Sequence, residues 1–219
     1  MNWIFFACIV IVGGVYLYFQ QPFFGGKIKG ERKNRVEKSK NYKDGAFQNL
    51  SETPSLAEGY TMTQVMWEFL TDKTQNKKPS QSFSFKKTDI KNLKPEENVF
   101  IWMGHSSYYL QVDGKRFLID PVFSGNASPI KGTNKAYKGS DLYTADDFET
   151  IDYLVISHDH YDHLDYKTIL ELKSKVKKIV CGLGVGAHFE HWGFNPNQLI
   201  ELDWYEESDL LNGFKITST

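Results

Sequence analysis

The run of residues 158–163, H-D-H-Y-D-H, constrains this chain more than any other part of its sequence. It places three imidazoles and an aspartate at ligand spacing, and these are donors that suit zinc or another borderline divalent metal. Residues 151–157, directly before it, form the apolar, β-branched run that is typical of a buried strand. In open α/β folds, ligands bind in the crevice beyond the carboxyl ends of the strands. The sequence therefore predicts an α/β domain with a metal site where this strand ends.

The spacing within the run predicts two ligand pairs. His158 and His160 lie two apart in an extended stretch, so their side chains lie on the same side and can hold one ion. Asp162 and His163 follow at the turn towards a helix and face a neighbouring position. All four are candidate metal ligands, and Asp162 and His163 are also the candidate catalytic residues of a two-metal hydrolytic site. The alternative, a solvated loop without a metal, is disfavoured by the ordered spacing behind a buried strand.

The flanking sequence predicts a layered α/β domain with a mixed sheet. Residues 108–120 alternate around Asp113-Gly114, a strong hairpin signal, and Pro121 ends the second strand because proline cannot donate to a ladder. The other expected elements are strands at 99–102, 178–181, 199–204 and 214–216 and helices at 165–172 and 187–192.

The motifs W-x-G-H-S-S at 102–107 and D-P-V-F-S at 120–124, together with H-x-H-x-D-H, resemble the metallo-β-lactamase superfamily. Within this superfamily, the residues of these motifs are similar to those of the N-acylphosphatidylethanolamine phospholipase D branch. The resemblance covers about residues 95–219 and implies the first half of a metallo-β-lactamase-like αββα sandwich. It also implies two divalent metal ions, with zinc as the first choice. Four of seven expected ligands would lie in this chain and three beyond Thr219.

Two residues outside the run are further candidates. His105 follows a strand–glycine turn, where it supports a metal ligand, faces the substrate, or serves as a hydrogen-bonded structural histidine. The resemblance makes Asp120, at its strand end, a residue that orients a metal-bound ligand or water.

A glycine-rich turn at 182–186 and the histidines after it favour structural roles. The turn lacks the G-x-G-x-x-G spacing and the G-K-[ST] ending of phosphate-binding loops, so tight packing is the favoured interpretation. His188 and His191 are neighbours on one helix face but have no acidic partner at matching spacing, which favours a half-exposed helix face.

The N-terminal sequence predicts an uncleaved transmembrane helix. Residues 3–19 carry no charge, have aromatic residues near both ends, and precede a basic segment at 27–40. A cleaved signal peptide is disfavoured because no basic start and no small-residue cleavage site are present. We expect a single-pass anchor, a cytoplasmic catalytic domain, and contact of residues 27–40 with anionic lipid head groups.

The expected organisation is an anchor at 3–19, a basic juxtamembrane segment and N-terminal extension at 20–94, and the half domain at 95–219. The net charge of −1 argues against nucleic acid as a partner and against an RNA-processing nuclease. The two cysteines, Cys8 and Cys181, form no disulfide framework.

The resemblance implies a membrane-anchored, zinc-dependent phosphodiesterase of the phospholipase D branch, which attacks a phospholipid-like substrate through a metal-bound hydroxide. One alternative is a hydrolase of a soluble substrate, similar to a sugar-phosphate lactonase. Another is a truncated fragment without catalytic competence. A β-lactamase role is disfavoured by the expected cytoplasmic location.

Overall fold

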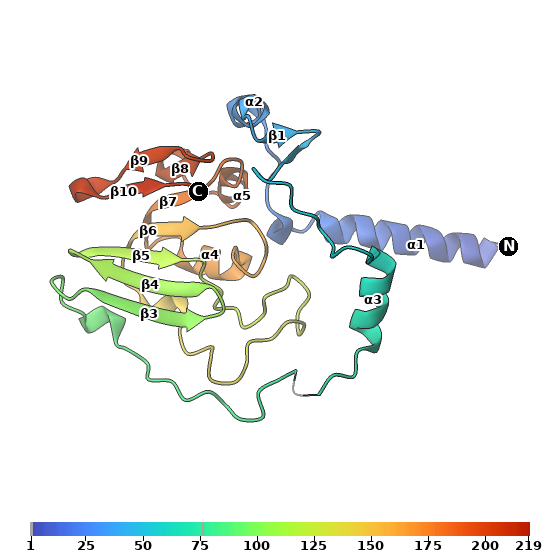
Figure 1. Cartoon of the computed structure of the whole chain (residues 1–219), viewed down its shortest axis with the longest axis horizontal. Helices are drawn as coiled ribbons and strands as arrows, with labels where there is room; N and C mark the ends of the chain where they lie inside the picture. The colour runs from blue at the N-terminus through green and yellow to red at the C-terminus, as the bar shows by residue number, and fades with distance from the viewer. Residues whose placement is uncertain (1, 76) are drawn as a thin grey trace.

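The computed structural model describes residues 2–75 and 77–219, and a six-stranded mixed sheet lies at its centre (Figure 1). The strand order β3-β4-β5-β6-β7-β8 follows the chain, so each strand pairs with the next one in sequence. The strands are β3 (Val99–Gly104), β4 (Ser107–Val112), β5 (Lys115–Ile119), β6 (Ile151–Ile156), β7 (Val176–Gly182) and β8 (Leu199–Leu202).

The strands β3, β4 and β5 form an antiparallel meander. The strands β5, β6, β7 and β8 run parallel to one another, so β5 belongs to both parts. Asp113 and Gly114 connect β4 to β5 with φ angles of 46° and 71°. Two positive φ angles are what a tight type I′ hairpin turn requires, so the hairpin prediction is confirmed. The crossovers after β6 and β7 carry α4 (Tyr166–Leu172) and α5 (Gly186–His191), as parallel pairing demands.

The sheet separates two apolar clusters. The larger one packs the sheet against both crossover helices through residues such as Leu154, Ile169 and Phe189, all fully buried. The smaller one contains Phe117 and Leu210 on the other side. That side is partly covered by the antiparallel pair β9 (Glu207–Asp209) and β10 (Lys215–Thr217). Because β6 is buried on both faces, its sequence from Tyr153 to Ile156 is a continuous apolar run instead of an alternating one.

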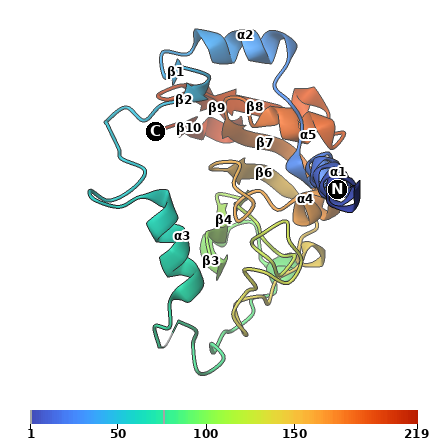
Figure 2. The ribbon, with the colours of Figure 1, turned by 90° about the vertical axis from the view of Figure 1, so that its right-hand side faces the viewer.

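The N-terminal part of the chain contributes helices at the periphery. These are α1 (Asn2–Phe19), α2 (Gly30–Lys38) and α3 (Met62–Thr71), with the short pair β1 (Tyr42–Lys43) and β2 (Ala46–Phe47) after α2. Figure 2 shows α2 lying across β8 and β9 near α5. The 3-10 turns are η1 (Pro22–Phe24), η2 (Ile90–Asn92), η3 (Ala145–Asp147), η4 (Pro196–Gln198) and η5 (Leu211–Gly213).

The prediction of a transmembrane helix at 3–19 is wrong, and with it the single-pass membrane location. Among the residues that the structure describes, no helix combines the length and apolar character needed to cross a bilayer. The helix α1 has 18 residues. At a rise of about 1.5 Å per residue it is about 27 Å long, against a hydrocarbon core of about 30 Å.

Two arginines of the basic segment at 27–40 form ion pairs within the protein. Arg32 forms ion pairs with Glu190 and Glu201, and Arg35 pairs with Glu206. These contacts hold α2 against the domain. Contact of this segment with lipid head groups stays a prediction.

Candidate metal centre

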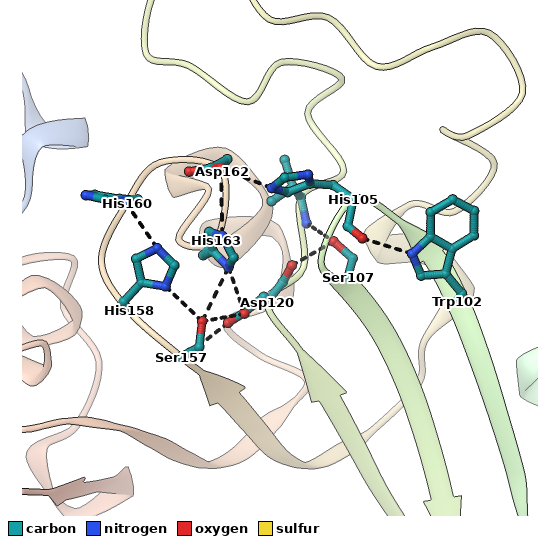
Figure 3. Close-up of polar contacts among 10 residues, drawn as sticks. Trp102, His105, Ser107, Asp120, Ser157, His158, His160, Asp162 and His163 are labelled. Carbon is teal, nitrogen blue, oxygen red and sulfur yellow. Dashed lines mark hydrogen bonds and ion pairs between the residues drawn. The ribbon is translucent and has the colours of Figure 1, made fainter. Parts of the chain in front are cut away.

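The candidate centre is built where two neighbouring parallel strands end. Ile119 of β5 pairs with Val155 of β6, so the residues that follow both strands meet at the same sheet edge (Figure 3). Asp120 follows β5 with a φ of 42°, and Ser157 follows β6. The Ser157 backbone N–H donates to Oδ1 of Asp120 over 2.8 Å, and its hydroxyl donates to Oδ2 over 2.6 Å. These bonds fix the carboxylate at the start of the H-x-H-x-D-H loop.

Asp120 in turn fixes one candidate ligand. Its side chain is buried, and its Oδ2 lies 2.9 Å from Nδ1 of His163. A carboxylate accepts, so Nδ1 of His163 carries the proton and Nε2 keeps its lone pair. That Nε2 lies 3.7 Å from Oδ2 of Asp162. An imidazole that donates from one nitrogen to a carboxylate and offers the other is the usual arrangement of a metal-bound histidine.

The other two histidines of the run face each other. Nε2 of His158 lies 3.1 Å from Nδ1 of His160, and Nδ1 of His158 lies 3.0 Å from Oγ of Ser157. The His158 and His163 rings are 3.9 Å apart between centroids. Burial, followed by the neighbouring charges of His163 and His160, lowers the pKa of His158 below its usual range. The neutral imidazole that predominates is the form that binds a metal.

His105 approaches the same point from the antiparallel part of the sheet. It follows Gly104 at a β-bulge between β3 and β4, and its own φ is 44°. Such a conformation is unfavourable for a side chain of this size and is found preferentially at functional sites. Nε2 of His105 lies 3.0 Å from Oδ2 of Asp162. The left-handed turn therefore points His105 at a candidate ligand.

Asp162 is held in its ionised form. Partial burial alone would raise its pKa, but the hydrogen bond from its own backbone N–H and the contact with His105 outweigh burial and lower the pKa. The nearby charges of His163 and His105 add to this. A carboxylate together with imidazoles is a donor set that suits a divalent cation.

The structure thus brings all six predicted site residues together at one end of the sheet. Donor atoms of His105, Asp162 and His163 lie within 4.8 Å of one another, and His158 and His160 complete the group through the contacts described above. The nitrogen and oxygen donors, with His163 oriented from behind by Asp120, fit a divalent metal of the zinc type.

A pocket of about 580 Å³ opens beside this group. His105 and Asp162 of the candidate centre line it. The aromatic residues Phe83, Trp102 and Tyr137 also line it, and Trp102 lies beside His105, because its indole N–H donates to the His105 carbonyl oxygen over 2.9 Å. Polar side chains of Asn126, Asn134 and Lys135 also line the pocket.

Two contributors to the site were not predicted from the sequence. Ser157 directly precedes the run and bonds both Asp120 and His158. Its position between a strand and the first histidine was the available signal. His188 is partly exposed, in keeping with the predicted half-exposed helix face, but its Nε2 also lies 3.3 Å from Oδ2 of Asp159, an acidic partner that was not predicted. His191 is exposed.

The glycine-rich turn at 182–186 binds a carboxylate of the protein itself. The backbone N–H groups of Gly184 and Gly186 both donate to Oε1 of Glu201. The turn therefore serves packing between β7, α5 and β8, as predicted.

Comparison with known proteins agrees with this site. Residues 115–219 match the model of the β-lactamase superfamily domain. An uncharacterised protein of Mycobacterium tuberculosis is 33% identical over 178 residues, which cover 80% of this chain and 47% of that protein. The N-acyl-phosphatidylethanolamine-hydrolyzing phospholipase D 1 of Caenorhabditis elegans is 34% identical over 124 residues, covering 53% of this chain and 34% of the enzyme. A metal-dependent hydrolase of Caldivirga maquilingensis is 33% identical over 63 residues, which cover 29% of this chain and 22% of that protein.

The chain spans less than half the length of each of these relatives. The matched region contains the H-x-H-x-D-H loop, Asp120 and the parallel strands that carry them. By its domain match, the part of the chain from residue 115 to residue 219 belongs to the metallo-β-lactamase superfamily, and the relatives that match parts of the chain include proteins named as hydrolases.

Proposed function

We propose that this chain carries the metal-binding part of a zinc-dependent phosphodiesterase that acts on a phospholipid-like substrate. The observation that carries the proposal is the lining of the pocket, which combines His105 and Asp162 of the candidate centre with the aromatic residues Phe83, Trp102 and Tyr137. A substrate that combines an acyl chain with a phosphodiester matches both kinds of lining. The similarity to the phospholipase D of Caenorhabditis elegans supports the same substrate class.

The proposed ligands are His158 and His160 as one pair and Asp162 and His163 as the other. When bound, the metal ions would act as Lewis acids that activate water and polarise the scissile bond. Asp120 and Ser157 keep His163 and His158 in the required orientation.

His105 and Lys135 are proposed to act on the substrate. His105 contacts Asp162 and borders the pocket, so it can hold or donate a proton next to the reacting phosphate. Lys135 places a positive charge in the pocket lining, where it favours an anionic group. The aromatic side chains exclude water and bind the apolar part of the substrate.

The test uses the full chain loaded with Zn²⁺ and two phosphodiesters, bis(4-nitrophenyl) phosphate and an N-acyl-phosphatidylethanolamine in mixed micelles. We expect both to be hydrolysed, and we expect chelation or Asp162→Asn to abolish hydrolysis. Trp102→Ala should raise KM for the lipid about tenfold and raise KM for the small diester less, because the acyl chain has more apolar surface to pack on the aromatic lining.

The matched control is Trp67→Ala, because Trp67 lies exposed on α3 outside this pocket. It should change neither KM. Hydrolysis of a sugar-phosphate lactone without hydrolysis of either diester would instead support the soluble-substrate alternative. Absence of metal-dependent hydrolysis of all three substrates would show that this chain alone is not catalytically competent.

A further inference from the structure

The segment of residues 22–38, here called the N-terminal strap, crosses α5 and the end of β8 (Figure 2). It is anchored at its start, where the indole Nε1 of Trp192 donates to the carbonyl oxygen of Pro22 over 2.8 Å. It is anchored again at Val36, which is buried. Gly184 gives it room, because a Cβ there would lie 2.9 Å from Cδ1 of Ile28.

Arg32 clamps the middle of the strap. Its Nε lies 2.7 Å from Glu201, and its two terminal nitrogens lie 3.0 and 2.7 Å from the oxygens of Glu190. The Arg32 and Glu201 side chains are only 13% and 11% exposed. Hydrogen bonding to Glu190, opposed by burial and reinforced by Glu201, raises the pKa of Arg32. Loss of this partner would leave the Glu201 carboxylate largely buried and uncompensated, which is unfavourable.

His188 connects the strap to the metal loop. The backbone N–H of Gly26 donates to Nδ1 of His188 over 3.1 Å, so this nitrogen is unprotonated. The proton of the neutral ring is therefore on Nε2, which donates to Asp159. The His188 ring also stacks on Trp192, with ring centroids 5.9 Å apart and 28° between the planes. The position of the strap and the position of the His188 ring therefore depend on each other.

The approach of the strap to His188 depends on two glycines. A Cβ at Gly25 would lie 1.7 Å from Nδ1 of His188, and one at Gly26 would lie 2.3 Å from the carbonyl oxygen of Ala187. Both distances are far inside van der Waals contact. The strap backbone can reach the ring only because neither residue has a side chain.

Asp159 is the residue between the two proposed ligands His158 and His160. In an extended stretch its side chain points away from theirs, so His188 holds the loop from the side opposite the metal. We propose that His188 is a positioning residue, which transmits the docking of the strap to the metal loop and so sets the spacing of His158 and His160. The link to metal binding rests on the proposed function, whereas the link to loop order does not.

The first test measures hydrogen exchange in the metal-free full chain. The amides of His163 and Leu164 both donate to the carbonyl oxygen of His160, over 3.0 and 2.8 Å, and so report on loop order. His188→Ala and Arg32→Ala should each accelerate their exchange about tenfold. His188→Gln should restore part of the protection, because its amide offers both an acceptor and a donor.

The control for Arg32→Ala is Lys33→Ala, because both residues lie on α2. Lys33 is 60% exposed and pairs only weakly with Glu37 one turn away, so loop exchange should not change. Asp159→Ala removes the other end of the contact at an exposed side chain, with little risk to folding. Combined with His188→Ala it should give the same exchange rate as either single variant, because both remove the same link.

The second test measures Zn²⁺ affinity by competition with a chelator. Removal of residues that orient metal ligands typically weakens binding about 10–100-fold, and we expect the lower end for His188→Ala and Arg32→Ala. Unchanged loop exchange in His188→Ala would overturn the proposal, as would a change that merely follows global unfolding in urea. If the unmodified chain binds no Zn²⁺, the proposed function fails, and the exchange experiment still decides the positioning role.

Discussion

Nδ1 of His163 lies 2.9 Å from Oδ2 of Asp120, and the two side chains come from loops at the ends of adjacent parallel strands. The carboxylate selects the tautomer of the imidazole and leaves Nε2 available. Parallel pairing of β5 with β6 is what brings together residues 43 positions apart. The orientation of a candidate ligand is thus a direct result of sheet topology.

Asp120→Asn should weaken Zn²⁺ binding about 10–100-fold, because the amide no longer stabilises the Nδ1–H tautomer of His163 with a negative charge. Chelator competition on the full chain measures this. The control is Asp146→Asn, since the Asp146 side chain is 99% exposed and lies on η3, outside the candidate centre. Equal affinity of Asp120→Asn and the unmodified chain would remove Asp120 from the site.

Gly104→Ala should destabilise the fold and disturb the pocket. The φ of Gly104 is +104°, and a Cβ there would lie 2.4 Å from the carbonyl oxygen of Ser140. We expect a loss of about 1–3 kcal/mol from the backbone conformation alone, with a further loss from the clash. Urea unfolding measures the free energy. Gly13→Ala, a helical position with nothing within 4 Å, should not lower the free energy of unfolding, because alanine has the higher helix propensity.

Thr168→Val should lower the free energy of unfolding by about 1–3 kcal/mol. The buried Thr168 hydroxyl donates to Oδ2 of Asp165 over 2.6 Å and accepts from the backbone N–H of Phe123 over 2.8 Å. Valine keeps the shape of the side chain but has no hydroxyl, so Asp165 and the backbone N–H of Phe123 each lose a hydrogen bond. Thr217→Val, at an exposed position on β10, should change stability by less than about 0.5 kcal/mol in the same urea titration.

Stability should depend on Asp152 at acidic pH. Burial alone would raise the pKa of Asp152, but hydrogen bonds from Lys177 and from the backbone of Arg116 lower it. Because its folded-state pKa lies below the unfolded value of about 3.9, the carboxylate stabilises the fold above that value. This contribution is lost as the pH falls through the folded-state pKa.

Asp152→Asn should therefore reduce the free energy of unfolding by about 1 kcal/mol at pH 6, with a smaller difference at pH 3. Urea titrations at both pH values measure it, with Asp146→Asn as the exposed control. A difference that is the same at both pH values would show that ionisation of Asp152 does not contribute.

Local sequence patterns predicted the elements that carry the site. The apolar run at 151–157 forms a buried parallel strand, and Asp113-Gly114 forms the hairpin. Both depend on short-range physics: burial on two sheet faces demands a continuous apolar run, and a tight turn demands positive φ. The same patterns misled at residues 3–19, where an uncharged apolar run forms a helix of 18 residues, but no described helix has the length and apolar character needed to cross a bilayer.

Contacts between distant residues could not be predicted in this way. His188 meets Asp159 across 29 positions, and Arg32 meets Glu201 across 169. Neither pairing follows from spacing along a helix or strand, because each depends on how the strap crosses the finished sheet. The role of Ser157 was missed for the same reason, since it exists only once β5 lies beside β6.

The span of the Arg32–Glu201 ion pair has a consequence for the order of folding. Contacts between residues far apart in sequence form late, because the intervening chain must be ordered first. During synthesis, the strap leaves the ribosome long before α5 and β8 exist, so its buried arginine has no partner until the sheet is nearly complete. Docking of the strap is therefore expected to be among the last folding steps, and the loop of residues 158–163 should gain its final order only then.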